Sequence, residues 1–109
     1  MSIKIESTLF HADWCGHCKH FLPEWKKLQD KIKGMGGKVG NVTINAQEFE
    51  ESKIDKSKVK INGKDIRGYP TVKIAVEKNG KKVEYEYDGK RSVDELYFHL
   101  TEQASKNIK

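Results

Sequence analysis

Two cysteines separated by two residues are the part of this sequence best suited to chemistry. Cys15 and Cys18 lie in the segment WCGHCK, residues 14–19, where a predicted strand gives way to a predicted helix. With only two cysteines, the chain lacks the several bridges of a small disulfide-stabilised secreted domain. A bond between them closes a very small loop and stabilises a fold little. The spacing therefore predicts chemical use of the pair.

The start of the helix sets the expected order of the two thiols. A helix N-terminus presents unpaired N–H groups and a partial positive charge, so we expect Cys15 to be exposed and its thiolate stabilised. Cys18 lies one turn further in, on the same face, and is predicted to cleave the mixed disulfide that Cys15 forms with a substrate. His17, after Gly16, adds a tunable positive charge that favours the reduced form and makes the disulfide a better oxidant.

Metal binding is the alternative use of a Cys-x-x-Cys pair. His11, His17 and His20 lie nearby in the sequence, but a structural zinc site takes four ligands and the chain has no second Cys-x-x-Cys pair. We therefore predict no metal and no other cofactor, and interpret His11 and His20 as ordinary partly buried or surface histidines. A small metal-binding domain stays open as an alternative function.

Hydrophobic patterning predicts a single α/β domain over residues 1–109, with element order β-α-β-α-β-β-α. The strands and helices follow from alternating or helically spaced apolar residues bounded by glycine turns. They give a mixed central sheet with helices on both faces. The predicted strands span residues 3–12, 39–44, 71–77 and 82–87, and the predicted helices span residues 15–33, a short stretch within 46–58, and a last segment capped by Ser92.

Composition excludes several classes of partner. The net charge of +5 is spread over the whole chain and is not interleaved with aromatics, so no nucleic-acid partner is expected. No apolar run reaches the roughly 20 residues of a membrane span, and a monomer is expected. The first ten residues do not read as a signal peptide, and the last five carry no retention tetrapeptide. The chain as written is therefore expected to be cytoplasmic or otherwise untargeted.

The WCGHCK segment resembles the active site of the protein disulfide isomerase family, within the thioredoxin superfamily. Three other parts match in order: Pro23, eight residues after Cys15; the segment RGYPT at 67–71; and the segment YDGKRS at 87–92. The match covers roughly residues 7–104. It implies a thioredoxin-like fold and a thiol–disulfide oxidoreductase that acts on protein dithiols and disulfides, recycled by a redox partner or glutathione.

The resemblance also implies roles for residues outside the dithiol. Pro70 would follow a cis peptide bond and lie opposite the cysteines, which leaves the backbone of Tyr69 free to pair with an extended substrate. Arg91 would swing near Cys18 and help it ionise; the alternative is a solvated surface arginine. Trp14 would shield Cys15 by packing beside it and contribute some substrate contact.

The sequence also departs from the family. Leu9 stands where relatives carry a buried carboxylate that handles the proton of the inner thiol, and the matching lysine aligns near Thr43. Glu6 lies an odd number of residues from Leu9 and so faces the other side of the strand. Only about a dozen residues precede the dithiol, so the usual first strand and helix are expected to be missing. A binding or packaging component with weak turnover is therefore a second interpretation.

Overall fold

A five-stranded mixed sheet with strand order β2-β3-β1-β6-β7 forms the centre of the computed structural model, which describes residues 3–107. The ends of the predicted domain, residues 1–2 and 108–109, lie outside the described residues. The strands are β1 (Ile3–His11), β2 (Lys38–Val39), β3 (Val42–Glu50), β4 (Lys60–Ile61), β5 (Lys64–Asp65), β6 (Thr71–Lys78) and β7 (Lys81–Glu86). The helices are α1 (Gly16–Gly34) and α2 (Val93–Asn107), with short 3₁₀ turns η1 (Glu51–Lys53) and η2 (Lys56–Lys58).

The strand pairing confirms the predicted mixed sheet. β1 lies at the centre and pairs in parallel with β3 and antiparallel with β6. The parallel pair follows from the α1 crossover, because a helix between two strands returns the chain in the same direction. β6 and β7 form the hairpin expected at Asn79-Gly80, where both residues have positive φ values of 55° and 79°. This is the backbone conformation that a two-residue hairpin turn requires.

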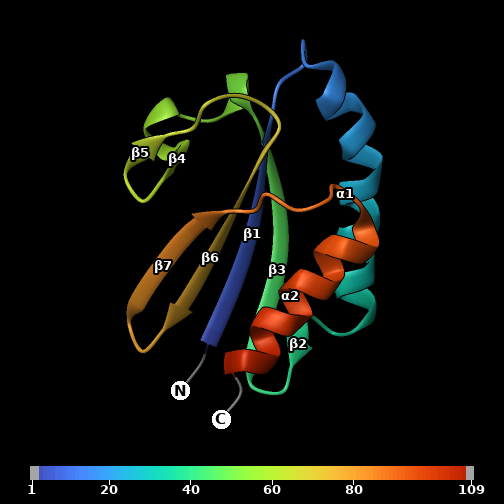
Figure 1. Cartoon of the computed structure of the whole chain (residues 1–109), viewed down its shortest axis with the longest axis vertical. Helices are drawn as coiled ribbons and strands as arrows, with labels where there is room; N and C mark the ends of the chain where they lie inside the picture. Colours follow the sequence, from blue (N-terminus) through green and yellow to red (C-terminus); the bar gives the residue numbers. More distant parts are fainter. Residues whose placement is uncertain (1–2, 108–109) are drawn as a thin grey trace.

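Both helices cover the same face of the sheet (Figure 1). They pack against each other and against β3, and they share one apolar core with the inward side chains of β1. The buried side of α1 includes Cys18, Phe21 and Trp25. Phe21 and Trp25 share the apolar core with Ile5 and Leu9 of β1, whereas Cys18 belongs to the separate cluster of the dithiol. α1 runs back along the sheet, so its N-terminus lies at the end of the sheet where β1 finishes (Figure 1).

The short helix predicted within residues 46–58 is wrong. β3 continues to Glu50 in register with β1, and only the two 3₁₀ turns follow. The carboxylates of Glu50 and Asp55 accept hydrogen bonds from the backbone N–H groups of Ser52 and Ser57. Such local side-chain bonds compete with a longer helix. The expectation of helices on both faces is therefore wrong as well, and a hairpin of β4 and β5 follows instead.

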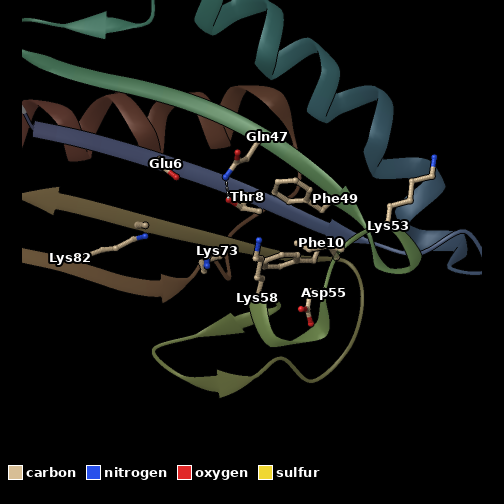
Figure 2. Close-up of a pocket in the computed structure, with 12 residues that line it drawn as sticks. Glu6, Thr8, Phe10, Gln47, Phe49, Lys53, Asp55, Lys58, Lys73 and Lys82 are labelled. Atoms are coloured by element: carbon tan, nitrogen blue, oxygen red, sulfur yellow. Dashed lines mark hydrogen bonds between the residues drawn. The ribbon is translucent and has the colours of Figure 1, made fainter.

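The face of the sheet without helices carries a shallow cavity of about 380 Å³. Figure 2 shows Thr8 and Phe10 of β1 beside Gln47 and Phe49 of β3, with Asp55 and Lys58 at the border. Gln47 donates a hydrogen bond to Thr8 at 2.9 Å. Within residues 3–107, no helix is both long enough and apolar enough to cross a membrane.

The last helix begins close to its predicted position. The Oγ of Ser92 accepts a hydrogen bond from the backbone N–H of Glu95 at 3.4 Å, which is half of the expected capping box. Just before it, Gly89 lies against the ring of Tyr87. A Cβ at position 89 would lie 2.6 Å from the Tyr87 hydroxyl oxygen, so a larger residue there would displace the Tyr87 ring.

Candidate dithiol site

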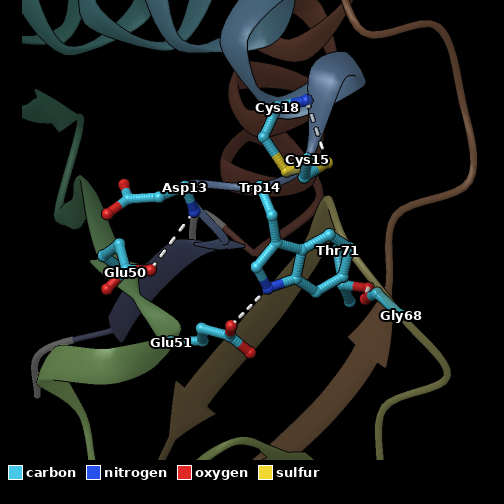
Figure 3. The surroundings of a disulfide bond; sticks show 8 residues. All are labelled: Asp13, Trp14, Cys15, Cys18, Glu50, Glu51, Gly68 and Thr71. Carbon is cyan, nitrogen blue, oxygen red and sulfur yellow. Dashed lines mark hydrogen bonds between the residues drawn. A yellow bond between two sulfur atoms is a disulfide. The ribbon is translucent and has the colours of Figure 1, made fainter.

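Cys15 and Cys18 form a disulfide at the N-terminus of α1 (Figure 3). Cys15 is the N-cap residue, with extended backbone dihedrals, and its sulfur accepts a hydrogen bond from the backbone N–H of Cys18 at 3.1 Å. The two Cα atoms are 5.2 Å apart, which is within the normal span of a disulfide. The sulfur of Cys15 therefore lies at the positive end of the helix, where a thiolate is stabilised.

The expectation that Cys15 is exposed is wrong for this oxidised form. Cys15 is 5% exposed and Cys18 is 0% exposed. The two residues pack with Ala12, and Tyr69 covers part of this cluster. Because Cys18 lies one turn into the helix and over the core, Cys15 stays the more accessible of the two.

The β1–α1 loop brings the cysteines to the edge of the sheet. β1 ends at His11, and the backbone N–H of Cys15 donates to the carbonyl of Ala12 at 3.1 Å, which closes a tight turn. Asp13 and Trp14 are exposed at the tip of this turn. The turn is tied to the end of β3 twice: the N–H of Asp13 donates to Glu50 at 3.3 Å, and the indole N–H of Trp14 donates to Glu51 (Figure 3).

Tyr69 lies beside the dithiol although it is more than 50 residues away in sequence. The Tyr69-Pro70 peptide bond is cis. Tyr69 packs on the cysteine cluster and meets Trp14 edge to face, with ring centroids 5.9 Å apart. Burial, and then the nearby charge of Glu51, raise the pKa of the Tyr69 hydroxyl. The turn before β6 is closed by the hydroxyl of Thr71, which donates to the carbonyl of Gly68 at 2.6 Å.

Three predicted site residues have no contact that fixes a role. Gly16 and His17 are exposed on the first turn of α1, and a Cβ at position 16 would meet no atom within 4 Å. Arg91 is exposed between β7 and α2, and within residues 3–107 its side chain forms no ion pair. The roles that the sequence analysis assigned to these three residues stay predictions.

The position of the family's buried carboxylate is apolar here. Leu9 is fully buried in the core under the helices. Thr43 pairs with Lys4 near the far end of β1. Glu6 lies on the opposite face, where it lines the cavity and forms an ion pair with Lys4 at 2.9 Å. Glu6 therefore cannot replace a carboxylate at position 9, as the spacing predicted.

His11 is buried and pairs with a half-buried carboxylate, which the sequence analysis missed. Its side chain is buried, and Nε2 lies 3.0 Å from a carboxylate oxygen of Glu48. The Cα of Glu48 pairs with that of Leu9, so the His11–Glu48 contact lies beside the apolar position. The interpretation of His11 as an ordinary histidine overlooked that residues 9 and 11 share one face of a strand.

The acidic end of β3 was missed as well. Glu50 and Glu51 hold the loop that carries Trp14. Hydrogen bonds from Ser52, together with the backbone N–H of Asp13, lower the pKa of Glu50. The signal in the sequence was a run rich in carboxylates, EFEE at 48–51, which covers the last three residues of β3 and the residue after it. Within residues 3–107, no group of three or more His, Cys, Asp or Glu side chains is arranged to hold a metal ion.

Comparison with known proteins agrees with this geometry. The family model for thioredoxin matches residues 7–102, which include the dithiol, Pro70 and Arg91. The chain belongs to the thioredoxin family. The predicted thioredoxin-like α/β fold is thereby confirmed.

Several relatives of this chain are named protein disulfide-isomerases. Protein disulfide-isomerase 1 of Dictyostelium discoideum is 33% identical over 100 residues, covering 92% of this chain and 25% of that protein. The solution structure of the first thioredoxin domain of mouse protein disulfide-isomerase A4 is 31% identical, with a TM-score of 0.63, and covers 96% of this chain and 66% of that one. Human ERp44 is 26% identical, with a TM-score of 0.65, and covers 91% of this chain and 24% of that one. The chain thus spans about a quarter of its D. discoideum relative.

Proposed function

We propose that this domain exchanges thiols and disulfides in protein substrates through Cys15 and Cys18, in the manner of a disulfide isomerase domain. The observation that carries the proposal is the position of the pair. One sulfur caps the N-terminus of α1, and the other lies one turn deeper, within bonding distance and shielded from water. This arrangement separates an attacking thiol from a resolving thiol.

The exchange proceeds in two displacements. The Cys15 thiolate attacks one sulfur of a substrate disulfide; a bond from Cys15 to that sulfur forms, and the other substrate sulfur leaves as a thiolate that takes a proton from water. The Cys18 thiolate then attacks the sulfur of Cys15, so that the Cys15–Cys18 bond forms and the substrate is released as a dithiol. The substrate gains two electrons and the domain loses two. The reverse sequence oxidises a substrate.

Tyr69 provides the surface on which an extended substrate would lie. It packs against the cysteine cluster and precedes Pro70. Within residues 3–107, its backbone groups take part in no backbone–backbone hydrogen bond. A substrate strand pairing with these groups would bring its sulfur toward Cys15. After a substrate has been reduced, a redox protein or glutathione would reduce the Cys15–Cys18 disulfide back to the dithiol.

A binding or packaging component with slow turnover is the second candidate. The observation that favours it is Leu9, which is fully buried where relatives carry the proton-accepting carboxylate. In that case the domain would still form mixed disulfides but would resolve them slowly.

Disulfide reduction separates the two candidates. We expect wild-type protein to reduce insulin catalytically with dithiothreitol as the electron source, and Cys15→Ser to be inactive. One turnover or less over hours in the wild type, together with trapped mixed disulfides, would support the slow-turnover component. Absence of both turnover and mixed disulfides would contradict the proposed function.

A further inference from the structure

One wall of the dithiol site combines aromatic rings with carboxylates. It is made by the tip of the β1–α1 loop, the end of β3 and the segment before β6 (Figure 3). We call this surface the acidic wall. Its members are Asp13, Trp14, Glu50, Glu51 and Tyr69.

Trp14 is held in place but largely uncovered. The residue is 70% exposed, although it directly precedes Cys15. The indole N–H donates to Glu51, and the ring meets Tyr69 edge to face. A large aromatic side chain fixed at two points loses little further conformational freedom when a partner binds. Most of its ring surface is therefore available to a substrate bound at Cys15.

The carboxylates of the wall form no ion pair with the lysines and arginines of residues 3–107. Within residues 3–107, none of Asp13, Glu50 and Glu51 is in an ion pair, whereas Glu48 is paired with His11. Hydrogen bonds from Ser52 lower the pKa of Glu50, which keeps it charged near neutral pH. The wall is thus locally negative in a chain whose net charge is +5.

The negative charge reaches the surface where a substrate would lie. Glu51 and Glu50 both add to the effect of burial in raising the pKa of Tyr69, whose backbone is the proposed docking strand. On the helix side of the same dithiol, Lys19 is exposed on the first turn of α1. A bound peptide would therefore meet the carboxylates of the acidic wall on one side of Cys15 and Lys19 on the other.

We propose that the acidic wall selects protein segments that carry a lysine or arginine beside the reactive cysteine. This inference rests on the proposed exchange function and names its substrate class. A cation next to the substrate sulfur would lie against the exposed ring of Trp14 and within the field of Glu50 and Glu51. A glutamate in the same place would meet two like charges.

Two matched peptides test the selection. Each contains the same disulfide, with either two lysines or two glutamates flanking one cysteine, and the exchange rate kcat/KM is measured for both at low salt. We expect the lysine peptide to react about fivefold faster, the upper end of what an exposed charge pair contributes. Because exposed charges are screened, the ratio should fall toward one in about 1 M salt.

Variants that lack the charges of Glu50 and Glu51 test whether the acidic wall causes the preference for the lysine peptide. Glu50→Gln/Glu51→Gln removes two charges, and glutamine at 51 can still accept the Trp14 indole hydrogen bond. The lysine-to-glutamate ratio, taken within each protein, should fall to about one. The control Glu77→Gln/Glu102→Gln changes the net charge equally at the end of β6 and on α2, and should keep the wild-type ratio.

The outcomes separate the two levels of the inference. A wild-type ratio near one with readily measured exchange would overturn the selection and leave the exchange function standing. A ratio that falls equally in the control variant would assign the effect to net charge, which also overturns the role of the wall. Absence of exchange with both peptides would overturn the exchange function and the selection with it.

Discussion

The two sides of the dithiol are built in opposite ways. On the α1 side, Cys15 and Cys18 lie one helical turn apart. The N-terminus of α1 and the backbone N–H of Cys18 stabilise the sulfur of Cys15. On the acidic wall, Trp14 meets residues more than 35 positions away: Glu51, the first residue of η1, and Tyr69 before β6. Reactivity in this domain is local in the chain, whereas the surface for substrates is assembled by the sheet.

This difference predicts unequal sensitivity to mutation. Changes on the helix side alter the thiols themselves, so they should affect every substrate by large factors. Changes on the wall remove single exposed contacts, each of which contributes about 1 kcal/mol or less. The following predictions test this contrast, from the largest expected effect to the smallest.

Cysteine substitutions should give the largest effects. Cys15→Ala should abolish exchange, because the attacking sulfur is gone. Cys18→Ala should instead accumulate a mixed disulfide through Cys15, because the attacker survives without its resolving partner. Non-reducing gels and mass spectrometry of the trapped species check both outcomes. Alkylation of the reduced protein that labelled Cys18 before Cys15 would reverse the assignment.

Leu9→Glu should accelerate resolution of a mixed disulfide near pH 7. Cys18 is fully buried, which disfavours its thiolate, and no carboxylate occupies position 9 to take its proton. In the wild type, resolution should therefore be slow near neutral pH and become faster as pH rises. Stopped-flow resolution of a preformed mixed disulfide at several pH values measures this. The variant should be less stable, because an unpartnered carboxylate is costly to bury.

A control variant makes the Leu9 experiment sharper. Leu9→Gln adds a polar group of similar size without a proton acceptor of carboxylate strength, so it should not reproduce the acceleration. A fast, pH-independent step in the wild type would contradict the prediction and direct attention to the His11–Glu48 pair. An unchanged rate in Leu9→Glu would show that proton removal from Cys18 does not limit resolution.

His17, one of the two residues between the cysteines, should set the reduction potential. With His17 at this position, we expect a potential nearer that of a disulfide isomerase, about −180 mV, than that of thioredoxin, about −270 mV. His17→Pro should move it in the reducing direction by tens of millivolts, since a charge that favours the thiolate is lost. Equilibration with glutathione measures both proteins, and a wild-type value below about −250 mV would count against the expectation.

Removing the charge of Glu50, which accepts a hydrogen bond from the β1–α1 loop, should give the smallest effect, a small change in Tm. The pKa of Glu50 lies below its ordinary value of 4.5 because of hydrogen bonds from Ser52 and Asp13. A carboxyl whose pKa is lowered by folding adds stability above its unfolded pKa and loses it as pH falls through the folded value. Glu50→Gln should therefore lower Tm slightly at pH 7, and this difference should shrink below about pH 4. Thermal unfolding at both pH values checks it; a difference that persists at low pH would contradict the charge-based explanation.

Local patterns predicted those elements whose formation depends on neighbouring residues. The hairpin at Asn79-Gly80 was predictable because positive φ at both turn positions is a property of the dipeptide. The helix after Cys15 was predictable because Phe21, Trp25 and Leu28 repeat at helical spacing. The segment after Ile44 was misread, because its extension as β3 depends on pairing with β1, which no local pattern records.

The sequence by itself determined the chemistry of the site: a two-residue spacing at a helix start brings both sulfurs within reach of each other in any fold that keeps the helix. Only the tertiary structure decided how covered these sulfurs are and what surrounds them. Cys15 is buried because Ala12 and Tyr69 pack against the dithiol cluster, and Glu51 reaches Trp14 because β3 runs parallel to β1. Burial and electric field depend on distances through space, so they are fixed when the strands pair and not before.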